Sequence, residues 1–134
     1  MSSILKYFNK VNAQKQINNL AKKFKNKKIV VYGAGEYFKI LYEKFNLSKL
    51  NIVAISDKKF ETNKATNFTN YVALAPNELK EYDFDVILVA LYDDVSLLDY
   101  LEYELLMGTI NEGKKVTSFI EPTFWYAVKT LLSK

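Results

Sequence analysis

The sequence predicts an α/β fold with three layers, in which helices cover both faces of a parallel sheet of about five strands. Three observations lead to this prediction. A short apolar run is followed at once by two glycines, a helical pattern and a second apolar run. Further apolar runs alternate with helical patterns along the chain, and an extra helical segment precedes the first run. Such alternation is typical of parallel strands joined by crossover helices.

The first 26 residues form the extra helical segment, and residues 27–134 form the sheet domain. Apolar residues recur at helical spacing in two stripes, which indicates one helix or a pair of helices. The stripes are Ile4, Phe8 and Val11, and then Ile17, Leu20, Ala21 and Phe24. We expect this segment to dock on the sheet or on a partner chain. The lysine-rich run at 22–28 is interpreted as a solvated helix end, where positive charge complements the helix dipole.

A complete strand–helix–strand unit is predicted between Lys27 and Asp57. The apolar run at 29–32 is typical of a strand that is buried on both faces of a parallel sheet. One apolar helix face follows at positions i, i+3, i+4 and i+7, namely Phe38, Leu41, Tyr42 and Phe45. A second apolar run at 52–55 completes the unit. This order is typical of the opening of a Rossmann-type nucleotide-binding domain.

The two glycines of this unit carry the main functional signal. Gly33 and Gly35 permit a sharp turn from strand to helix, and they leave room for a phosphate at the helix N-terminus. Asp57 lies 22 residues after Gly35, near the usual place of the acid that binds a ribose hydroxyl. The GxGxxG fingerprint is incomplete, because Phe38 stands at its third, normally small, position. A glycine turn that serves only the chain topology is therefore an alternative to a nucleotide site.

The remaining apolar runs complete the predicted sheet. The polar stretch Lys58–Asn70 is expected to be a mobile loop. Strands are predicted at 71–74, 83–90 and 116–120. Helical segments are predicted to begin at Pro76, at Asp93 or Asp94, and at Pro122, with Gly108 as the stop of the second. Right-handed crossovers then give the strand order 3-2-1-4-5.

Ligands of such sheets bind at the carboxyl ends of the strands, where the strand order reverses. The predicted cofactor-binding residues at this edge are Gly33, Ala34, Gly35, Glu36, Asp57, Lys58 and Tyr92. The rest of the predicted crevice is Tyr37, Leu91, Asp93, Asp94 and Glu121. Its acids repel a diphosphate unless Lys58 or Lys59 folds in, and Glu36 would compete for the helix N–H groups. The two aspartates are interpreted as helix caps, and the two tyrosines as candidates for stacking on a base or sugar.

The composition excludes several kinds of chemistry. The chain of 134 residues has no histidine, cysteine or arginine, and lysines carry its whole net charge of +4. It therefore lacks the usual near-neutral general base, a disulfide framework, a thiolate metal site and a bidentate cation for phosphate or guanine. No apolar run approaches the roughly 20 residues that span a bilayer. We expect a cytoplasmic protein that binds no nucleic acid and has no membrane span.

Four phrases resemble small Rossmann-like domains of bacterial surface-polysaccharide biosynthesis: VVYGAGEYFKIL, NIVAISDKKF, APNELKEYDFDVILVAL and KKVTSFIEP. One such group is the N-terminal nucleotide-sugar-binding domain of sugar acetyltransferases. The other is the accessory C-terminal domain of sugar C-methyltransferases and related sugar-modifying enzymes. The resemblance covers Lys27 to Pro122. It implies that Gly33, Gly35 and Asp57 contact a nucleotide or its sugar.

Three functional hypotheses follow, and no catalytic residue is assigned in any of them. The first is a nucleotide- or nucleotide-sugar-binding domain that acts in sugar modification. The second is a small NAD(P)-binding oxidoreductase-like domain, in which Asp57 favours NAD, although only 77 residues follow it. The third is a non-enzymatic interaction module with a degenerate nucleotide site. In that case a homodimer or a partner enzyme would bind through the N-terminal helix or the aromatic segment Phe124–Trp125–Tyr126.

Overall fold

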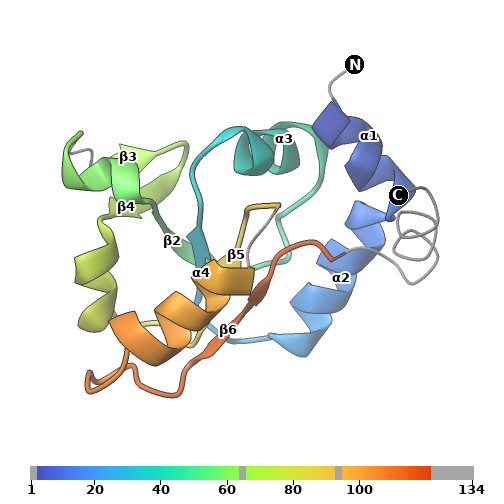
Figure 1. Ribbon diagram of the computed structural model, residues 1–134. Coiled ribbons are helices and arrows are strands. Elements are labelled where there is room, and N and C mark those ends of the chain that lie inside the picture. The colour runs from blue at the N-terminus through green and yellow to red at the C-terminus, as the bar shows by residue number, and fades with distance from the viewer. Residues whose placement is uncertain (1–2, 64–65, 93–94, 122–134) are drawn as a thin grey trace.

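The computed structural model describes residues 3–63, 66–92 and 95–121 and has an α/β fold (Figure 1). Its strands are β1 (Ile29–Tyr32), β2 (Ile52–Ser56), β3 (Asn67–Phe68), β4 (Tyr71–Leu74), β5 (Val86–Val89) and β6 (Lys115–Ser118). Its α-helices are α1 (Ser3–Lys10), α2 (Ala13–Lys23), α3 (Glu36–Lys44) and α4 (Val95–Tyr100). Three further helical turns are the 3₁₀ turns η1 (Lys58–Glu61) and η2 (Pro76–Lys80) and the π-helical turn η3 (Leu101–Leu105).

The sheet has six strands in the order β3-β4-β2-β1-β5-β6. Five of them are parallel and follow the predicted order, which is confirmed. The sixth is the short strand β3, which pairs antiparallel with β4 at the edge of the sheet. The strand order reverses at β1, since β2 lies on one side of it and β5 on the other. This reversal fixes where the carboxyl-edge crevice must lie.

The side chains of β1 alternate between two core clusters, one on each face of the sheet. Ile29 and Val31 contribute to a cluster that includes residues of α1, α2 and α3. Val30 and Tyr32 contribute to a cluster with residues of η2 and η3. Alternate residues of a strand point to opposite faces, so helical elements cover both sides of this strand. We call these the first face and the second face.

The N-terminal segment docks on the sheet, which is one of the two places, the sheet or a partner chain, that the sequence predicts for it. It forms a pair of helices, α1 and α2, joined at Asn12, whose φ of 58° lies in the left-handed region. Phe8, Val11 and Ile17 are almost completely buried in the first-face cluster. The apolar stripes that predicted the helices are therefore the surfaces that pack on the sheet.

Three expectations differ from the structure in detail. The described part of the predicted loop 58–70 contains η1 and β3, because Phe60 is buried in the first-face core and Phe68 packs against it. The predicted helix that stops at Gly108 instead ends as an α-helix at Tyr100 and continues as the π-helical turn η3. The predicted strand 83–90 is shorter, at Val86–Val89. The caps Asp93 and Asp94, the helix at Pro122 and Phe124–Trp125–Tyr126 lie outside the described residues.

Candidate functional site at the carboxyl edge

The first glycine of the turn is required by the packing of the sheet. Gly33 follows β1 with a φ of 119°, a backbone conformation that residues with a side chain rarely adopt. A Cβ atom at this position would lie 2.7 Å from the carbonyl oxygen of Ala90, which follows β5. The absence of a side chain at Gly33 is thus explained by the close approach of two backbones, independently of any ligand.

The second glycine lies in a different environment. Gly35 is the N-cap of α3, with a φ of −100°, and a Cβ atom built on it meets nothing within 4 Å. Both Gly35 and the following Glu36 are exposed. The space beside the N-terminus of α3 is therefore open at the position where the sequence predicts a phosphate.

Asp57 braces the glycine turn from the end of β2. Its Oδ2 atom accepts a hydrogen bond of 2.7 Å from the backbone N–H of Ala34, and its Oδ1 atom accepts one of 2.9 Å from Lys59. The Nζ atom of Lys59 donates in turn to the carbonyl oxygen of Ala34 and lies 4.7 Å from the ring centroid of Phe68. Asp57 and Lys59 thus bond the N–H and the carbonyl oxygen of Ala34. Asp57, which the sequence predicts to bind a ribose hydroxyl, therefore has a structural role in the turn.

A pocket of about 250 Å³ opens beside the turn, on the second face. It is lined by Tyr32, Lys58, Glu61, Pro76, Leu97 and Tyr100. These residues come from the end of β1, from η1 and η2, which follow β2 and β4, and from α4, so the pocket lies at the carboxyl edge of the sheet. Burial, and then the negative charge of Asp57, raises the pKa of Tyr32 to about 12. The Tyr32 hydroxyl therefore stays protonated at neutral pH and can donate a hydrogen bond.

A buried hydroxyl without a partner lies in the sheet next to this pocket. Ser56 is fully buried, and its Oγ atom has no hydrogen-bond partner among the described residues. In the register of the sheet Ser56 is paired with Tyr32 on one side and Leu74 on the other. Both neighbours belong to the second-face cluster, so the Ser56 side chain points to the face that holds the pocket.

The structure brings Tyr92 and Tyr37 together, and both rings also contact aromatic rings of α1. The Tyr92 ring makes edge contacts with Tyr37 and Tyr7, at centroid distances of 5.5 and 5.2 Å. The Tyr37 ring also meets Phe8 at 4.8 Å, and its hydroxyl bonds the carbonyl oxygen of Ile120. The N-terminal helix therefore occupies one flank of the predicted crevice.

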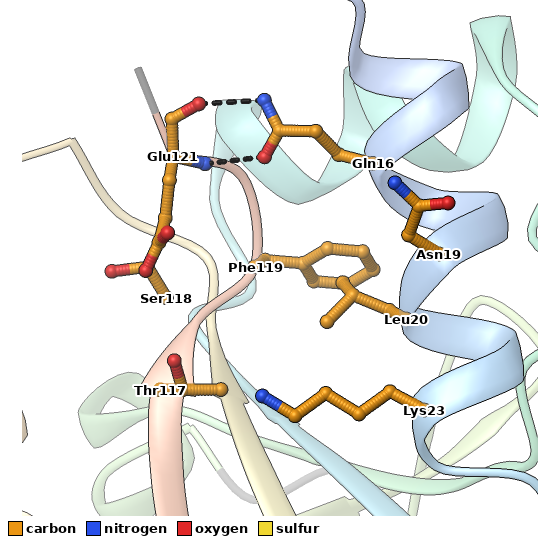
Figure 2. A pocket seen from close by; sticks show the side chains of 8 residues that line it. All are labelled: Gln16, Asn19, Leu20, Lys23, Thr117, Ser118, Phe119 and Glu121. Atoms are coloured by element: carbon orange, nitrogen blue, oxygen red, sulfur yellow. Dashed lines mark hydrogen bonds between the residues drawn. The ribbon is translucent and has the colours of Figure 1, made fainter. Parts of the chain in front are cut away.

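The other predicted crevice acid, Glu121, lies at a second pocket of about 220 Å³, between α2 and β6. The Gln16 carboxamide bonds the backbone of Glu121 in both directions, with distances of 2.6 and 2.8 Å (Figure 2). The side chain of Gln16 thus acts like a neighbouring strand and ties α2 to the end of β6. The structure assigns Glu121 to this junction rather than to the glycine turn.

The model of the family described as "C2185-like, N-terminal" matches residues 25–97, which is more than half of the chain. The chain belongs to the C2185-like N-terminal family. Comparisons with curated proteins and with solved structures gave no match. The C2185-like segment contains the glycine turn, Asp57 and all strands except β6.

The C2185-like segment also contains most of the site residues that sequence reasoning missed. The missed residues include Tyr32 and Ser56, which end the first two strands on the pocket face. Lys59 is one of the two lysines that were expected to fold in, and it braces the turn. The alternation of side chains along β1 and β2 is a signal that could have found Tyr32 and Ser56. Each of them ends its strand two residues after a second-face residue, Val30 or Ala54, and so lies on the same face. Nothing in the sequence pointed to Lys59 rather than Lys58.

The described residues contain no group of three or more acidic side chains placed to hold a metal ion. Within the same residues, no helix is long and apolar enough to cross a membrane. The groups available at the carboxyl edge are hydroxyls, the lysines Lys58 and Lys59, acids and backbone N–H groups. Such a set can bind and orient a polar ligand through hydrogen bonds.

Proposed function

We propose that the carboxyl edge binds a nucleotide or a nucleotide-sugar, in a three-layer Rossmann-like domain that acts in the cytoplasm in sugar modification for surface polysaccharides. One observation carries the proposal. The open helix N-terminus at Gly35, the braced Asp57 and the pocket beside Lys58 meet where the strand order reverses. Ligands of open α/β sheets bind at this place.

The parts of the ligand can be assigned by chemistry. A phosphate suits the open space at the N-terminus of α3, where N–H groups and the helix dipole favour an anion. A base or a sugar ring suits the pocket, where the hydroxyls of Tyr32 and Tyr100 and the carboxylate of Glu61 offer hydrogen bonds. Lys58 lines the same pocket and offsets the negative charge of the edge.

Asp57 can still take part, because each carboxylate oxygen has two acceptor positions and the turn uses one on each. A ligand hydroxyl would bond the remaining positions. The pocket volume of about 250 Å³ lies below the roughly 300–1,000 Å³ of typical ligand clefts. We therefore expect one ring of the ligand in the pocket and the rest across the turn.

A second candidate function is a non-enzymatic interaction module with a degenerate site. The contact at Gly33 favours it, because that glycine is already explained by the approach of Ala90. The hydrogen bonds of Asp57 to the turn favour it as well. The two functions differ in one measurable respect, which is whether the intact domain binds a nucleotide.

The test is a thermal-shift screen of the full chain with UDP-, GDP- and CDP-sugars, the free nucleotides, NAD, NADP, coenzyme A and S-adenosylmethionine. A ligand at 100 times its Kd should add about 2.7 kcal/mol to the free energy of unfolding, which is several degrees in Tm. A shift with a nucleotide-sugar supports the proposal, and a shift with NAD alone supports the oxidoreductase-like alternative. No shift with any compound contradicts both and leaves the interaction module.

A matched pair of variants then locates the site. Gly35→Asp places a carboxylate at the helix N-terminus, and Gly35→Ala adds only a methyl group to open space. By calorimetry we expect at least a tenfold loss of affinity in the first and less than a threefold change in the second, about 1.4 kcal/mol against less than about 0.7. Equal affinities of the wild type and Gly35→Asp would show that the phosphate does not bind at α3.

A further inference from the structure

A group of exposed apolar side chains belongs to η3 and the segment after it, whose buried residues pack on the second face. Of seven large apolar residues that are exposed in the described part of the chain, four lie between residues 100 and 110. Tyr103, Met107 and Ile110 are 59, 53 and 74% exposed, and Tyr100 lies at the pocket. We call Tyr103, Met107 and Ile110 the apolar stripe.

The segment that presents this stripe is anchored by polar contacts. The buried Asn111 side chain donates to the carbonyl oxygens of Leu79 and Tyr82, at 2.7 and 2.9 Å. The carboxylate of Glu112 accepts a hydrogen bond of 2.8 Å from the backbone N–H of Gly108. Ile110 therefore protrudes from a turn whose neighbours are held in place. An exposed apolar residue that is fixed in this way loses little conformational entropy when it is covered.

Acids predominate in the segment that carries the stripe, although Lys80 and Lys114 lie next to it in the structure. Residues 81–113 contain nine of the fifteen acids and no lysine, whereas residues 1–28 contain eight of the nineteen lysines and no acid. Four of these acids lie within or beside the stripe, namely Asp99, Glu102, Glu104 and Glu112. No lysine of the described residues lies within salt-bridge distance of their carboxylates. Helices α2 and α4 lie on different sides of the sheet (Figure 1), and the two regions meet only away from the stripe, at the amino edge, where Lys28 pairs with Asp83 and its N–H bonds Asp85.

We propose that the apolar stripe is a docking surface for a cationic segment of another protein. The apolar side chains of that segment, which lie between its own lysines or arginines, would pack on the stripe. The exposed apolar side chains supply buried area, and the acids supply complementary charge and orientation. The inference does not depend on nucleotide binding at the carboxyl edge.

A second copy of the chain fits this surface less well. A symmetric pairing of two stripes would place acids opposite acids, which is unfavourable. The lysines of α1 and α2 have the right sign, but the apolar side chains of these helices, such as Phe8 and Ile17, are buried against the sheet. These helices offer charge without exposed apolar side chains, so they suit the stripe less well than a segment of a different protein.

The experiment uses the full chain and two synthetic helical peptides with the same leucine stripe, one flanked by lysines and the other by glutamates. By fluorescence anisotropy the lysine peptide should bind at least tenfold more tightly than the glutamate peptide, and its affinity should fall as salt is raised. Equal affinities, or no binding of the lysine peptide, would overturn the proposal.

Variants and methyl NMR then locate the binding surface. Tyr103→Ser with Ile110→Ser should weaken binding of the lysine peptide at least tenfold, while Val72→Ser, which changes an exposed apolar residue on β4, should leave it unchanged. The chain has two methionines, so labelled methyl groups give a reporter at Met107 and a reference at Met1. A change in the methyl chemical shift of Met1 alone when the peptide is added contradicts the assigned surface. Wild-type affinity for the lysine peptide in the double variant contradicts it as well. A wild-type dimer that the double variant abolishes would assign the stripe to a second copy and overturn the proposal.

Discussion

The two faces of the sheet are packed in different ways. On the first face aromatic rings contact one another across α1, α3 and β4, as Phe8 does with Tyr37 and Phe38 with Tyr71, at centroid distances of 4.8 and 6.0 Å. On the second face the covering elements are short. This face also carries the buried side-chain amide of Asn111, the Ser56 hydroxyl, which has no hydrogen-bond partner among the described residues, and the exposed apolar stripe. We infer that the first face supplies most of the stability and that the second face carries the binding features.

The largest effect should come from removing a ring of the first face. Phe8→Ala leaves a cavity beside Tyr37 and Phe45 and should lower the free energy of unfolding by about 3–5 kcal/mol. Leu101→Ala on the second face should cost about 2 kcal/mol, because the π-helical turn that carries it can relax into the cavity. Urea denaturation of both variants measures the difference. A larger loss for Leu101→Ala would reverse the assignment of stability to the first face.

The two glycines of the turn separate a packing role from a binding role. Gly33→Ala should lower the free energy of unfolding by about 2 kcal/mol or more, because of its positive φ and the contact with the Ala90 carbonyl. Gly35→Ala should lower it by about 1 kcal/mol or less, since its Cβ meets open space and only the advantage of glycine over alanine at the N-cap is lost. Thermal unfolding of both proteins measures these values. A loss at Gly35 as large as the loss at Gly33 would mean that both glycines are required by packing, and it would weaken the phosphate assignment.

Much of the fold follows from the sequence because its signals are local. Apolar runs bounded by turn residues predict β1, β2 and β5, and the helical spacing of apolar residues predicts α3 and the N-terminal pair. The strand order then follows from crossover handedness, which is nearly invariant. The short strand β3 is different, because two residues give no periodic pattern and its place depends on Phe60 and Phe68 packing on the first face.

The candidate site is only partly predictable for a similar reason. The glycine turn, Asp57 and Lys58 are read from spacing along the chain, and the structure brings them to one edge. The hydrogen bond from Ala34 to Asp57 and the brace from Lys59 depend on the direction of side chains, which spacing does not determine. The same holds for Tyr92, whose neighbours Tyr7 and Tyr37 come from other helices. The assignment of a ligand to this edge stays a prediction.

The hydroxyl of Ser56 offers a smaller effect of opposite sign. Because its buried oxygen has no partner, Ser56→Ala should raise the free energy of unfolding of the ligand-free protein by about 1 kcal/mol. The exposed Ser48→Ala is the control and should change it by less than about 0.5 kcal/mol. If the Ser56 hydroxyl serves the pocket, the same variant should bind the ligand more weakly. A loss of stability in Ser56→Ala would show that the hydroxyl has a structural role on the second face.

The smallest effect is expected at the amino edge of the sheet, where the basic N-terminal region meets the acidic region. The backbone N–H of Lys28, followed by the positive charges of Lys114 and Lys27, lowers the pKa of Asp85 from its ordinary value of 3.8. Since the folded-state pKa lies below the unfolded one, Asp85 contributes stability above the unfolded pKa and loses it as the pH falls through the folded value. Asp85→Asn should therefore be slightly less stable than the wild type near neutral pH, and the difference should shrink between about pH 5 and about pH 3. Urea titrations across this range, repeated at high salt to screen the lysines, measure the convergence. A gap that stays constant with pH would mean that the charge of Asp85 contributes nothing and that only the geometry of its hydrogen bond joins the two regions.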